Sequence, residues 1–214
     1  TCAVLLEPVQ GEGGVYPCAE EYLAAVRALC DERGVLLAFD EVQCGCYRTG
    51  TPFAWQGYGV RPDVMALAKS LANGLPAGVV MASGAAAEAF APGDHGSTFG
   101  GGPVIAAAAL ATLDTLEKER LGENALATGA AFRAMLATLA EATGAIAEVR
   151  GRGLMLAAEL TTPRAQEVSA ACLDRGLVVN AIGDRVLRLL PPLVCTEAQT
   201  AILGDTLQSV LGAA

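Results

Sequence analysis

Two apolar runs of this chain each end at a charged residue that can do chemistry. Residues 35–39 run into Asp40, and residues 64–68 run into Lys69. An apolar run of this length between polar residues is typical of a strand buried on both faces of a parallel sheet. The carboxyl ends of such strands form the edge at which open α/β sheets bind ligands. We therefore expect the carboxylate and the amine to meet at one edge of a sheet.

A carboxylate and a lysine amine at one edge are the pair that a pyridoxal phosphate (PLP) site needs. The lysine forms a Schiff base with the cofactor, and the carboxylate pairs with the pyridinium nitrogen. Each residue taken singly also has an ordinary interpretation. Lys69 could be a solvated residue at a strand end, and Asp40 could be a turn former or a helix N-cap.

A Gly-rich loop at residues 95–103 carries two hydroxyls, Ser97 and Thr98, shortly before a helix that Pro103 is suited to begin. Free N–H groups and the helix dipole favour a phosphate at such a helix end. His95 is the only histidine, and we assign it a structural role. A single histidine excludes a His-rich metal site, and no metal is expected. The absence of a G-x-G-x-x-G motif after a strand disfavours a dinucleotide fold.

An arginine, Arg188, lies between Leu187 and Leu189 just before Pro191-Pro192. Two interpretations are open for an arginine in so apolar a strand. It could belong to the solvated face of an alternating strand, or it could form a bidentate clamp for a substrate carboxylate.

The elements that must position these residues follow from the hydrophobic pattern. Strands are predicted at 3–6, 35–39, 64–68 and 79–82, and a helix at 20–33 that ends at Gly34. Strand, helix and strand in that order predict a parallel βαβ unit. Residues 41–62 are predicted to form a long loop, residues 85–90 a short helix, and residues 104–121 and 124–142 two long helices that bend at Gly122.

The organisation changes near Gly144, where we expect a small α/β domain to begin. Its predicted elements are a loop at 149–153, strands at 154–160, 177–179 and 185–190, and helices at 164–175 and 197–211, the last with Thr196 as N-cap. The predicted fold class is therefore α/β. We expect residues 1–143 to belong to a large domain with a mostly parallel sheet, and residues 144–214 to a small carboxy-terminal domain.

Composition limits the class of protein. The chain has 214 residues, is 53% hydrophobic and carries a formal net charge of −9, which argues against a nucleic-acid surface. Its seven cysteines include no C-x-x-C pair, so reduced thiols and a cytoplasmic location are expected. No signal peptide or membrane helix is visible. The chain begins at Thr1, and a predicted core strand starts only two residues later. We therefore expect an amino-terminal part of a longer protein to be missing.

Taken together and in order, the motifs resemble the class III, PLP-dependent aminotransferases of fold type I. The matching stretches cover nearly the whole chain; they are residues 7–14 (EPVQGEGG), 39–43 (FDEVQ), 48–50 (RTG), 62–69 (PDVMALAK), 95–101 (HGSTFGG), 151–154 (GRGL) and 187–194 (LRLLPPLV). Any one of these motifs is weak evidence, but the ordered set is highly specific.

The resemblance implies a role for each residue of the cofactor site. Lys69 is the lysine that forms the Schiff base and shuttles the proton, and Asp40 pairs with the ring nitrogen. Gln43 is expected on the side of the phenolic oxygen, and it argues against the aminomutase branch of the family. Thr98, with Ser97, reaches the phosphate of the cofactor in a neighbouring subunit, which implies a homodimer.

The resemblance also implies how two substrates share one pocket. Arg188 holds the α-carboxylate of glutamate or 2-oxoglutarate, and Glu12 pairs with Arg188 while the larger amino donor is bound. The expected reaction is amino transfer from N-acetylornithine to 2-oxoglutarate, a step of arginine biosynthesis. Ornithine, succinylornithine and 4-aminobutyrate are the alternative donors, and a truncated, non-catalytic fragment of the same fold is a further alternative.

The sequence departs from the family pattern at two loops. Gly102 stands where asparagine is usual, and Ala72-Asn73-Gly74 stands where a run of glycines is usual. We expect both changes to be tolerated because they fall in loops. The expected amino-terminal part would carry the turn that holds the phosphate within the same subunit, the aromatic residue that stacks on the ring, and part of the substrate pocket.

Overall fold

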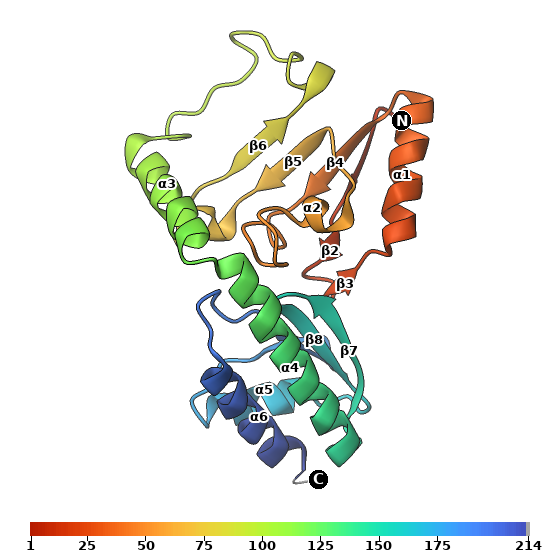
Figure 1. Ribbon diagram of the computed structural model, residues 1–214, viewed down its shortest axis with the longest axis vertical. Coiled ribbons are helices and arrows are strands. Elements are labelled where there is room, and N and C mark those ends of the chain that lie inside the picture. The colour runs from red at the N-terminus through yellow and green to blue at the C-terminus, as the bar shows by residue number, and fades with distance from the viewer. Residues whose placement is uncertain (213–214) are drawn as a thin grey trace. The chain divides into compact units, whose positions relative to one another are not determined.

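The computed structural model describes residues 1–212 and divides them into two compact units (Figure 1). The first unit comprises residues 1–8, 18–47 and 51–120, and the second comprises residues 9–17, 48–50 and the chain from Leu121 onward. Two short segments of the amino-terminal half, residues 9–17 and 48–50, thus belong to the second unit. The expected division into domains at residues 143 and 144 stays a prediction.

The first unit is built on a four-stranded sheet in the order β1-β4-β5-β6. Strands β1 (Ala3–Leu6), β4 (Leu36–Asp40) and β5 (Val64–Leu67) are parallel neighbours, and β6 (Val79–Ala82) runs antiparallel to β5. The apolar runs expected to form strands do so, and the predicted parallel βαβ unit is confirmed. Helix α1 (Glu20–Arg33) makes the crossover and packs against β4 (Figure 1). It ends at Gly34, whose φ of 63° needs the freedom of glycine.

The prediction that residues 41–62 form only a loop is wrong, because α2 (Ala54–Tyr58) lies within this segment. The carboxylate of Glu41 caps its first turn. The N–H groups of Ala54 and Trp55 donate to Glu41 Oε2 and Oε1 at 2.6 and 2.8 Å. A five-residue helix has too few residues for a hydrophobic period, and its cap comes from 13 residues upstream, so the local pattern could not reveal it.

The helices that follow β6 differ from the prediction in two places. Only a 3₁₀ turn, η2 (Gly84–Ala86), forms where a helix over residues 85–90 was expected. The two long helices, α3 (Pro103–Lys118) and α4 (Leu121–Thr143), are separated at Glu119 and Arg120, and the expected bend at Gly122 lies inside α4. Arg120 has a φ of 54°, which turns the chain between them.

The second unit contains an antiparallel sheet in the order β7-β8-β10-β9. Its strands are β7 (Ile146–Arg152), β8 (Met155–Leu160), β9 (Asn180–Ile182) and β10 (Val186–Leu189). Two predictions are corrected here: residues 149–153 lie in or next to strand β7 rather than in a loop, and the strand expected at 177–179 forms at 180–182. A short hairpin, β2 (Val9–Gln10) and β3 (Tyr16–Pro17), completes the strands of this unit.

Three helices of the second unit are α4, α5 (Ala165–Leu173) and α6 (Glu197–Leu211). α4 and α6 pack against each other, and α4 also covers β7 and β8. The predicted cap of α6 is confirmed, because the N–H of Thr196 donates to Gln199 Oε1 at 2.9 Å, as in a capping box. Within the described residues no helix is long and apolar enough to cross a bilayer. All seven cysteines are free thiols in the structure.

Glycines bring three backbone segments of this unit into direct contact. A Cβ on Gly129 of α4 would collide with the carbonyl oxygen of Gly153. A Cβ on Gly153 would in turn lie 2.6 Å from the carbonyl oxygen of Arg48. The Leu154 N–H donates to that same oxygen of Arg48 at 3.0 Å. The R-T-G and G-R-G-L motifs therefore pack on each other. Helix α4 packs on the second motif so closely that position 129 has no room for a side chain.

Gly129→Ala should destabilise the chain by about 1–3 kcal/mol, because the added methyl forces α4 away from Gly153 although alanine favours a helix. Urea unfolding followed by circular dichroism would measure the change. The matched control is Gly57→Ala in α2, where a Cβ meets only Thr51 Oγ1 at 3.6 Å, an ordinary contact. The control should change the free energy of unfolding by less than about 1 kcal/mol. Equal effects of the two changes would contradict the close packing of α4.

Candidate active site

Asp40 and Lys69 lie at the same edge of the first sheet. Asp40 is the last residue of β4 and is in register with Ala66 of the parallel strand β5. Lys69 follows β5 after one residue and begins the 3₁₀ helix η1 (Lys69–Ala72). Because β4 and β5 are parallel neighbours, the two side chains start from carboxyl ends that meet at one edge. The structure therefore places this pair at one edge, as the sequence predicted.

The backbone of Lys69 is in an unusual conformation. Its φ is 47°, in the left-handed region that residues with a Cβ seldom adopt. Such a conformation costs on the order of 1–3 kcal/mol, and it persists only where the surrounding structure enforces it. The residue is exposed, whereas Asp40 is half-buried and its Oδ1 accepts the N–H of Val42 at 2.9 Å. The side chain of Lys69 thus projects from a sharp turn of the backbone. The carboxylate of Asp40 is oriented by its hydrogen bond from the N–H of Val42.

Glu41 fixes the chain just after Asp40. Only 1% of its surface is exposed. Burial raises the pKa of Glu41 from 4.5 to about 7, although the hydrogen bonds from the N–H groups of Trp55 and Ala54 act in the opposite direction. Gly45 adds a second constraint, since a Cβ there would lie 2.8 Å from both the Glu41 carbonyl oxygen and Leu67 Cδ2. The segment after β4 is thereby packed against the end of β5, and Gln43 lies half-buried within it.

Ser97 and Thr98 lie in the exposed segment between β6 and α3. The hydroxyl of Ser97 accepts the N–H of Gly100 at 2.9 Å, so it closes a local turn. α3 begins at Pro103, five residues after Thr98. The hydroxyls therefore precede the helix by more than one turn instead of capping it, and their role toward a phosphate stays a prediction.

Arg188 and Glu12 meet within the second unit. Arg188 NH1 donates to Glu12 Oε1 at 2.9 Å, and its Nε donates to Asn180 Oδ1 at 2.9 Å. The arginine side chain is only 13% exposed, whereas that of Glu12 is 74% exposed. The structure thus joins the two residues that the sequence resemblance pairs. Arg188 also lines a largely apolar cavity of about 600 Å³, together with residues 177–180 and 189–192.

Sequence reasoning missed two contributors to this region, Asn180 and Arg150. Asn180 follows the apolar run 177–179, which the sequence pattern predicts as a strand, so no local signal indicates its pairing with Arg188. The glycines near Arg150 predict a loop at this position. Its burial, to 6% exposure of the side chain, has no local signal, because it depends on partners far away in the sequence.

Comparison with known proteins identifies the family. The profile of the class-III aminotransferases matches residues 1–211. The chain belongs to the class-III aminotransferases. Acetylornithine aminotransferase 1 of Bordetella bronchiseptica is 52% identical over 192 residues, which cover 90% of this chain and 49% of the relative. The resemblance drawn from the motifs is confirmed.

Solved structures of the family share the fold. Acetylornithine aminotransferase from Elizabethkingia anophelis aligns with a TM-score of 0.92 at 38% identity, over 98% of this chain and 53% of that protein. Ornithine delta-aminotransferase of Plasmodium falciparum aligns with a TM-score of 0.92 at 35% identity, over 98% of this chain and 56% of that protein. The predicted PLP fold type I is thus confirmed. The chain spans about half the length of the curated relatives that it matches.

Class-III aminotransferases use PLP, and the residues at the sheet edge fit that cofactor. The aldehyde and the ring nitrogen of PLP lie on opposite sides of its ring. An amine and a carboxylate on adjacent parallel strands can therefore address both groups at once. Lys69 and Asp40 supply this pair, whereas the described residues contain no cluster of His, Cys, Asp or Glu that could hold a metal.

The raised pKa of Glu41 predicts an unusual pH dependence of stability. Between its ordinary value of 4.5 and about 7, the folded chain holds a proton that the unfolded chain has lost. Stability from this group should therefore decrease as pH rises through that window, by on the order of 3 kcal/mol. The measurement is the free energy of urea unfolding of wild type minus that of Glu41→Gln, at several pH values.

The matched control is Asp63→Asn. Burial would raise the pKa of Asp63, but hydrogen bonds from the Leu37 N–H and the Arg27 guanidinium, with the charge of Arg27, outweigh it and hold that pKa below 3.8. Asp63 therefore titrates below the window. The difference in free energy of unfolding between wild type and Asp63→Asn should be constant between pH 4.5 and 7. If the difference in free energy of unfolding between wild type and Glu41→Gln did not change with pH, the raised pKa of Glu41 would be contradicted.

Proposed function

We propose that the protein to which this chain belongs transfers an amino group from N-acetylornithine to 2-oxoglutarate, with PLP as cofactor. The observation that carries the proposal is the placement of Asp40 and Lys69 at one edge of the parallel pair β4 and β5. The names of the relatives support the choice of amino donor, since several that are 42–54% identical to the chain are acetylornithine aminotransferases.

Lys69 and Asp40 would hold the cofactor and divide the proton chemistry between them. When bound, PLP supplies an electron-withdrawing ring that stabilises a carbanion at the substrate's reacting carbon. Asp40 keeps a proton on the ring nitrogen, because a carboxylate beside a pyridinium favours the charged form. Lys69 would hold the cofactor and would shuttle the proton that leaves the reacting carbon of the substrate. Gln43 would contact the side of the phenolic oxygen.

Arg188 and Glu12 would let one site accept two substrates. A guanidinium binds the α-carboxylate of glutamate or 2-oxoglutarate through paired, charge-assisted hydrogen bonds. The hydrogen bond to Glu12 neutralises Arg188 while the larger donor is bound. Because Glu12 is mostly exposed, its ion pair is weak enough for a substrate carboxylate to displace it.

A homodimer is part of the proposal, with Thr98 and Ser97 serving the phosphate of the neighbouring subunit's cofactor. Exposed apolar side chains support such an interface in the first unit. They include Val80 on β6, Leu110 on α3 and Phe99 beside the two hydroxyls. Exposed apolar side chains that form a contiguous patch mark an interaction surface. A cytoplasmic location is likewise proposed.

Ornithine is the second candidate amino donor, because ornithine delta-aminotransferase of Plasmodium falciparum has the same fold with a TM-score of 0.92. Succinylornithine and 4-aminobutyrate remain further alternatives, as does a chain that keeps the fold without catalysis. Steady-state rates with each donor, in the natural full-length protein that contains this chain, separate these substrates. A donor other than N-acetylornithine with the highest kcat/KM would contradict the proposal.

Lys69→Ala should abolish the absorbance band that PLP gains near the visible edge when a lysine holds it. The chain has only one other lysine, Lys118, an exposed residue of α3, so Lys118→Ala is the matched control and should keep the band. Borohydride reduction and peptide mapping would show which lysine carries the cofactor. A band that survives in Lys69→Ala would contradict the assignment. A band in the full-length protein but not in the 214-residue chain would show that this chain alone is inert.

Arg188→Ala should lower kcat/KM of the glutamate half-reaction by about 100-fold or more, because a charged carboxylate loses its bidentate partner. The half-reaction with N-acetylornithine should fall much less. Single-turnover absorbance changes of the cofactor would measure each half separately. Arg175→Ala, at an exposed arginine after α5, is the control and should affect neither half. Equal losses in both halves would contradict the switch.

A further inference from the structure

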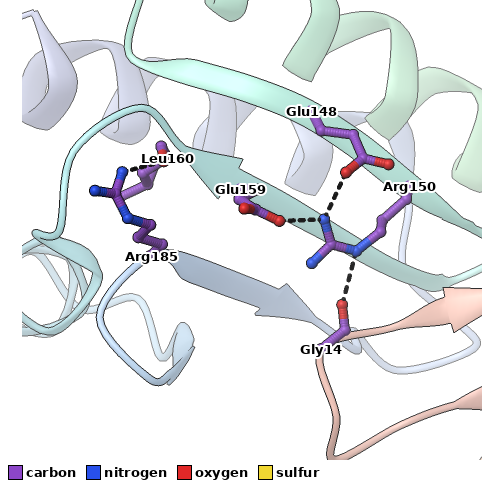
Figure 2. A network of polar contacts seen from close by, with 6 residues as sticks. All are labelled: Gly14, Glu148, Arg150, Glu159, Leu160 and Arg185. Carbon is purple, nitrogen blue, oxygen red and sulfur yellow. Dashed lines mark hydrogen bonds and ion pairs between the residues drawn. The ribbon is translucent and has the colours of Figure 1, made fainter.

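Arg150 of β7 is buried at the centre of a polar network that the proposed reaction leaves unassigned (Figure 2). Its NH1 donates to Glu148 Oε2 at 2.9 Å and to Glu159 Oε2 at 2.6 Å. Its Nε donates to the carbonyl oxygen of Gly14 at 3.0 Å, and its guanidinium carbon lies 4.0 Å from the centre of the Tyr16 ring. The arginine thus joins the sheet of the second unit to the segment at residues 9–17.

The sheet register places Arg150 and Arg188 in one row. Arg150 on β7 pairs with Ala157 on β8, and Ala157 pairs with Arg188 on β10. Residues directly opposite each other in an antiparallel sheet project from the same face. The two arginines therefore share a face, two strand spacings or about 10 Å apart, with a small residue between them. Asn180 on β9, the acceptor for Arg188 Nε, continues the row.

The segment at residues 9–17 bridges the two arginines. Gly14 and Tyr16 contact Arg150, and Glu12, two residues from Gly14, contacts Arg188. We refer to residues 9–17 as the Glu12 hairpin. Its strands β2 and β3 pair over only two residues each, and such a short hairpin is not stable by itself. Its shape must therefore come from contacts with the sheet.

The turn of the Glu12 hairpin is strained. Gly14 has a φ of 117°, which glycine tolerates, but Val15 has a φ of 59°, which is rare for a β-branched residue. Val15 is completely buried. A strained turn persists only when surrounding contacts enforce it, and strain of this kind is concentrated at ligand clamps and switches. The hydrogen bond from Arg150 to the Gly14 carbonyl oxygen acts at this turn.

The geometry at Arg150 is suited to arginine and not to lysine. One guanidinium uses Nε for the hairpin, NH1 for two carboxylates and its flat face for an aromatic ring. NH2 is buried without a hydrogen-bond partner in the described part of the chain. An unsatisfied buried donor costs stability, so the site is not optimised for stability alone. It is consistent with a residue that holds the hairpin in one position.

We propose that Arg150 is a positioning residue: by fixing the Glu12 hairpin, it sets how strongly Glu12 competes with a substrate carboxylate for Arg188. The inference rests on the proposed role of Arg188 and Glu12 in accepting two substrates. Glu12 is mostly exposed, and an exposed ion pair is weak because water and side-chain freedom oppose it. Its occupancy therefore depends on how firmly its backbone is held.

The test uses the natural full-length protein with PLP bound, and glutarate, a dicarboxylate without an amino group, as the probe. Glutarate competes with Glu12 for Arg188 but cannot react. Glu12→Gln removes the competitor and should tighten glutarate binding, measured by calorimetry, about two- to five-fold. Arg150→Lys keeps the positive charge but loses the Nε hydrogen bond to the Gly14 carbonyl oxygen. It should therefore tighten glutarate binding to a similar extent. The double variant should gain no more than either single variant.

Arg185→Lys is the matched control. Arg185 donates to the carbonyl oxygens of Leu160 and Thr161, not to the hairpin, as Figure 2 shows for Leu160. This variant should leave glutarate binding unchanged. Tyr16→Leu loosens the same clamp from the hairpin side, and it provides a second variant should Arg150→Lys fail to fold. It should also tighten glutarate binding.

The half-reactions provide a second readout, which a merely structural role would not move. In Arg150→Lys the ratio of KM for N-acetylornithine to KM for glutamate should rise as in Glu12→Gln, with kcat little changed. Equal changes in both half-reactions, or additive effects in the double variant, would overturn the inference while leaving the proposed function intact. A wild-type protein that transaminates neither substrate would overturn the proposed function, and the inference with it.

Discussion

The parallel pairing of β4 with β5 is the constraint on which the candidate cofactor site depends. The register of Asp40 with Ala66 brings the last residue of one strand level with the end of the next. An antiparallel pair would send Asp40 and Lys69 to opposite edges, and a shift of one residue would turn Asp40 to the other face of the sheet. The connection between β4 and β5, residues 41–63 with α2, makes the parallel arrangement possible, because it returns the chain to the start of the next strand. The buried side chains Leu37, Phe39, Met65 and Leu67 then fix the register by packing.

Contacts beyond the strands convert this register into a defined geometry. Glu41 is bound through two N–H groups of α2, which ties the segment after β4 to a helix 13 residues away. Gly45 allows that segment to approach Leu67 closely. The positive φ of Lys69 then redirects the chain directly after β5. A buried carboxylate, a glycine contact and a strained lysine thus surround the site, which agrees with the tendency of local strain to occur where function demands it.

The sequence predicted those features of the fold that arise from local patterns. The apolar runs at 3–6 and 64–68, the glycine that ends α1 and the capping box of α6 depend on neighbours within a few residues. What was missed depends on distant partners: α2 needs Glu41, and β7 continues through glycines because β8 pairs with it. For the candidate site, the strand ends indicated Asp40 and Lys69 and the Gly-rich loop indicated Thr98, whereas Gln43 and Glu12 came from the family resemblance. The row that joins Arg150, Ala157 and Arg188 follows from strand register, which no single stretch of sequence encodes.

The two arginines of that row have different carboxylate partners. This difference explains how one sheet can contain both a structural ion pair and an ion pair that a substrate carboxylate can replace. Glu148 and Glu159 face each other across β7 and β8, and like charges in that position repel unless a cation lies between them. Arg150 supplies that cation and donates to both carboxylates, so its charge is shared between two partners. Within residues 1–212, Arg188 has one carboxylate partner, Glu12, and that partner is exposed. Because a buried guanidinium whose carboxylate partner is exposed can exchange that carboxylate for another at little cost, the row contains one fixed arginine and one exchangeable arginine. The Glu12 hairpin contacts both, so the fixed arginine can determine the position from which Glu12 competes at the exchangeable one.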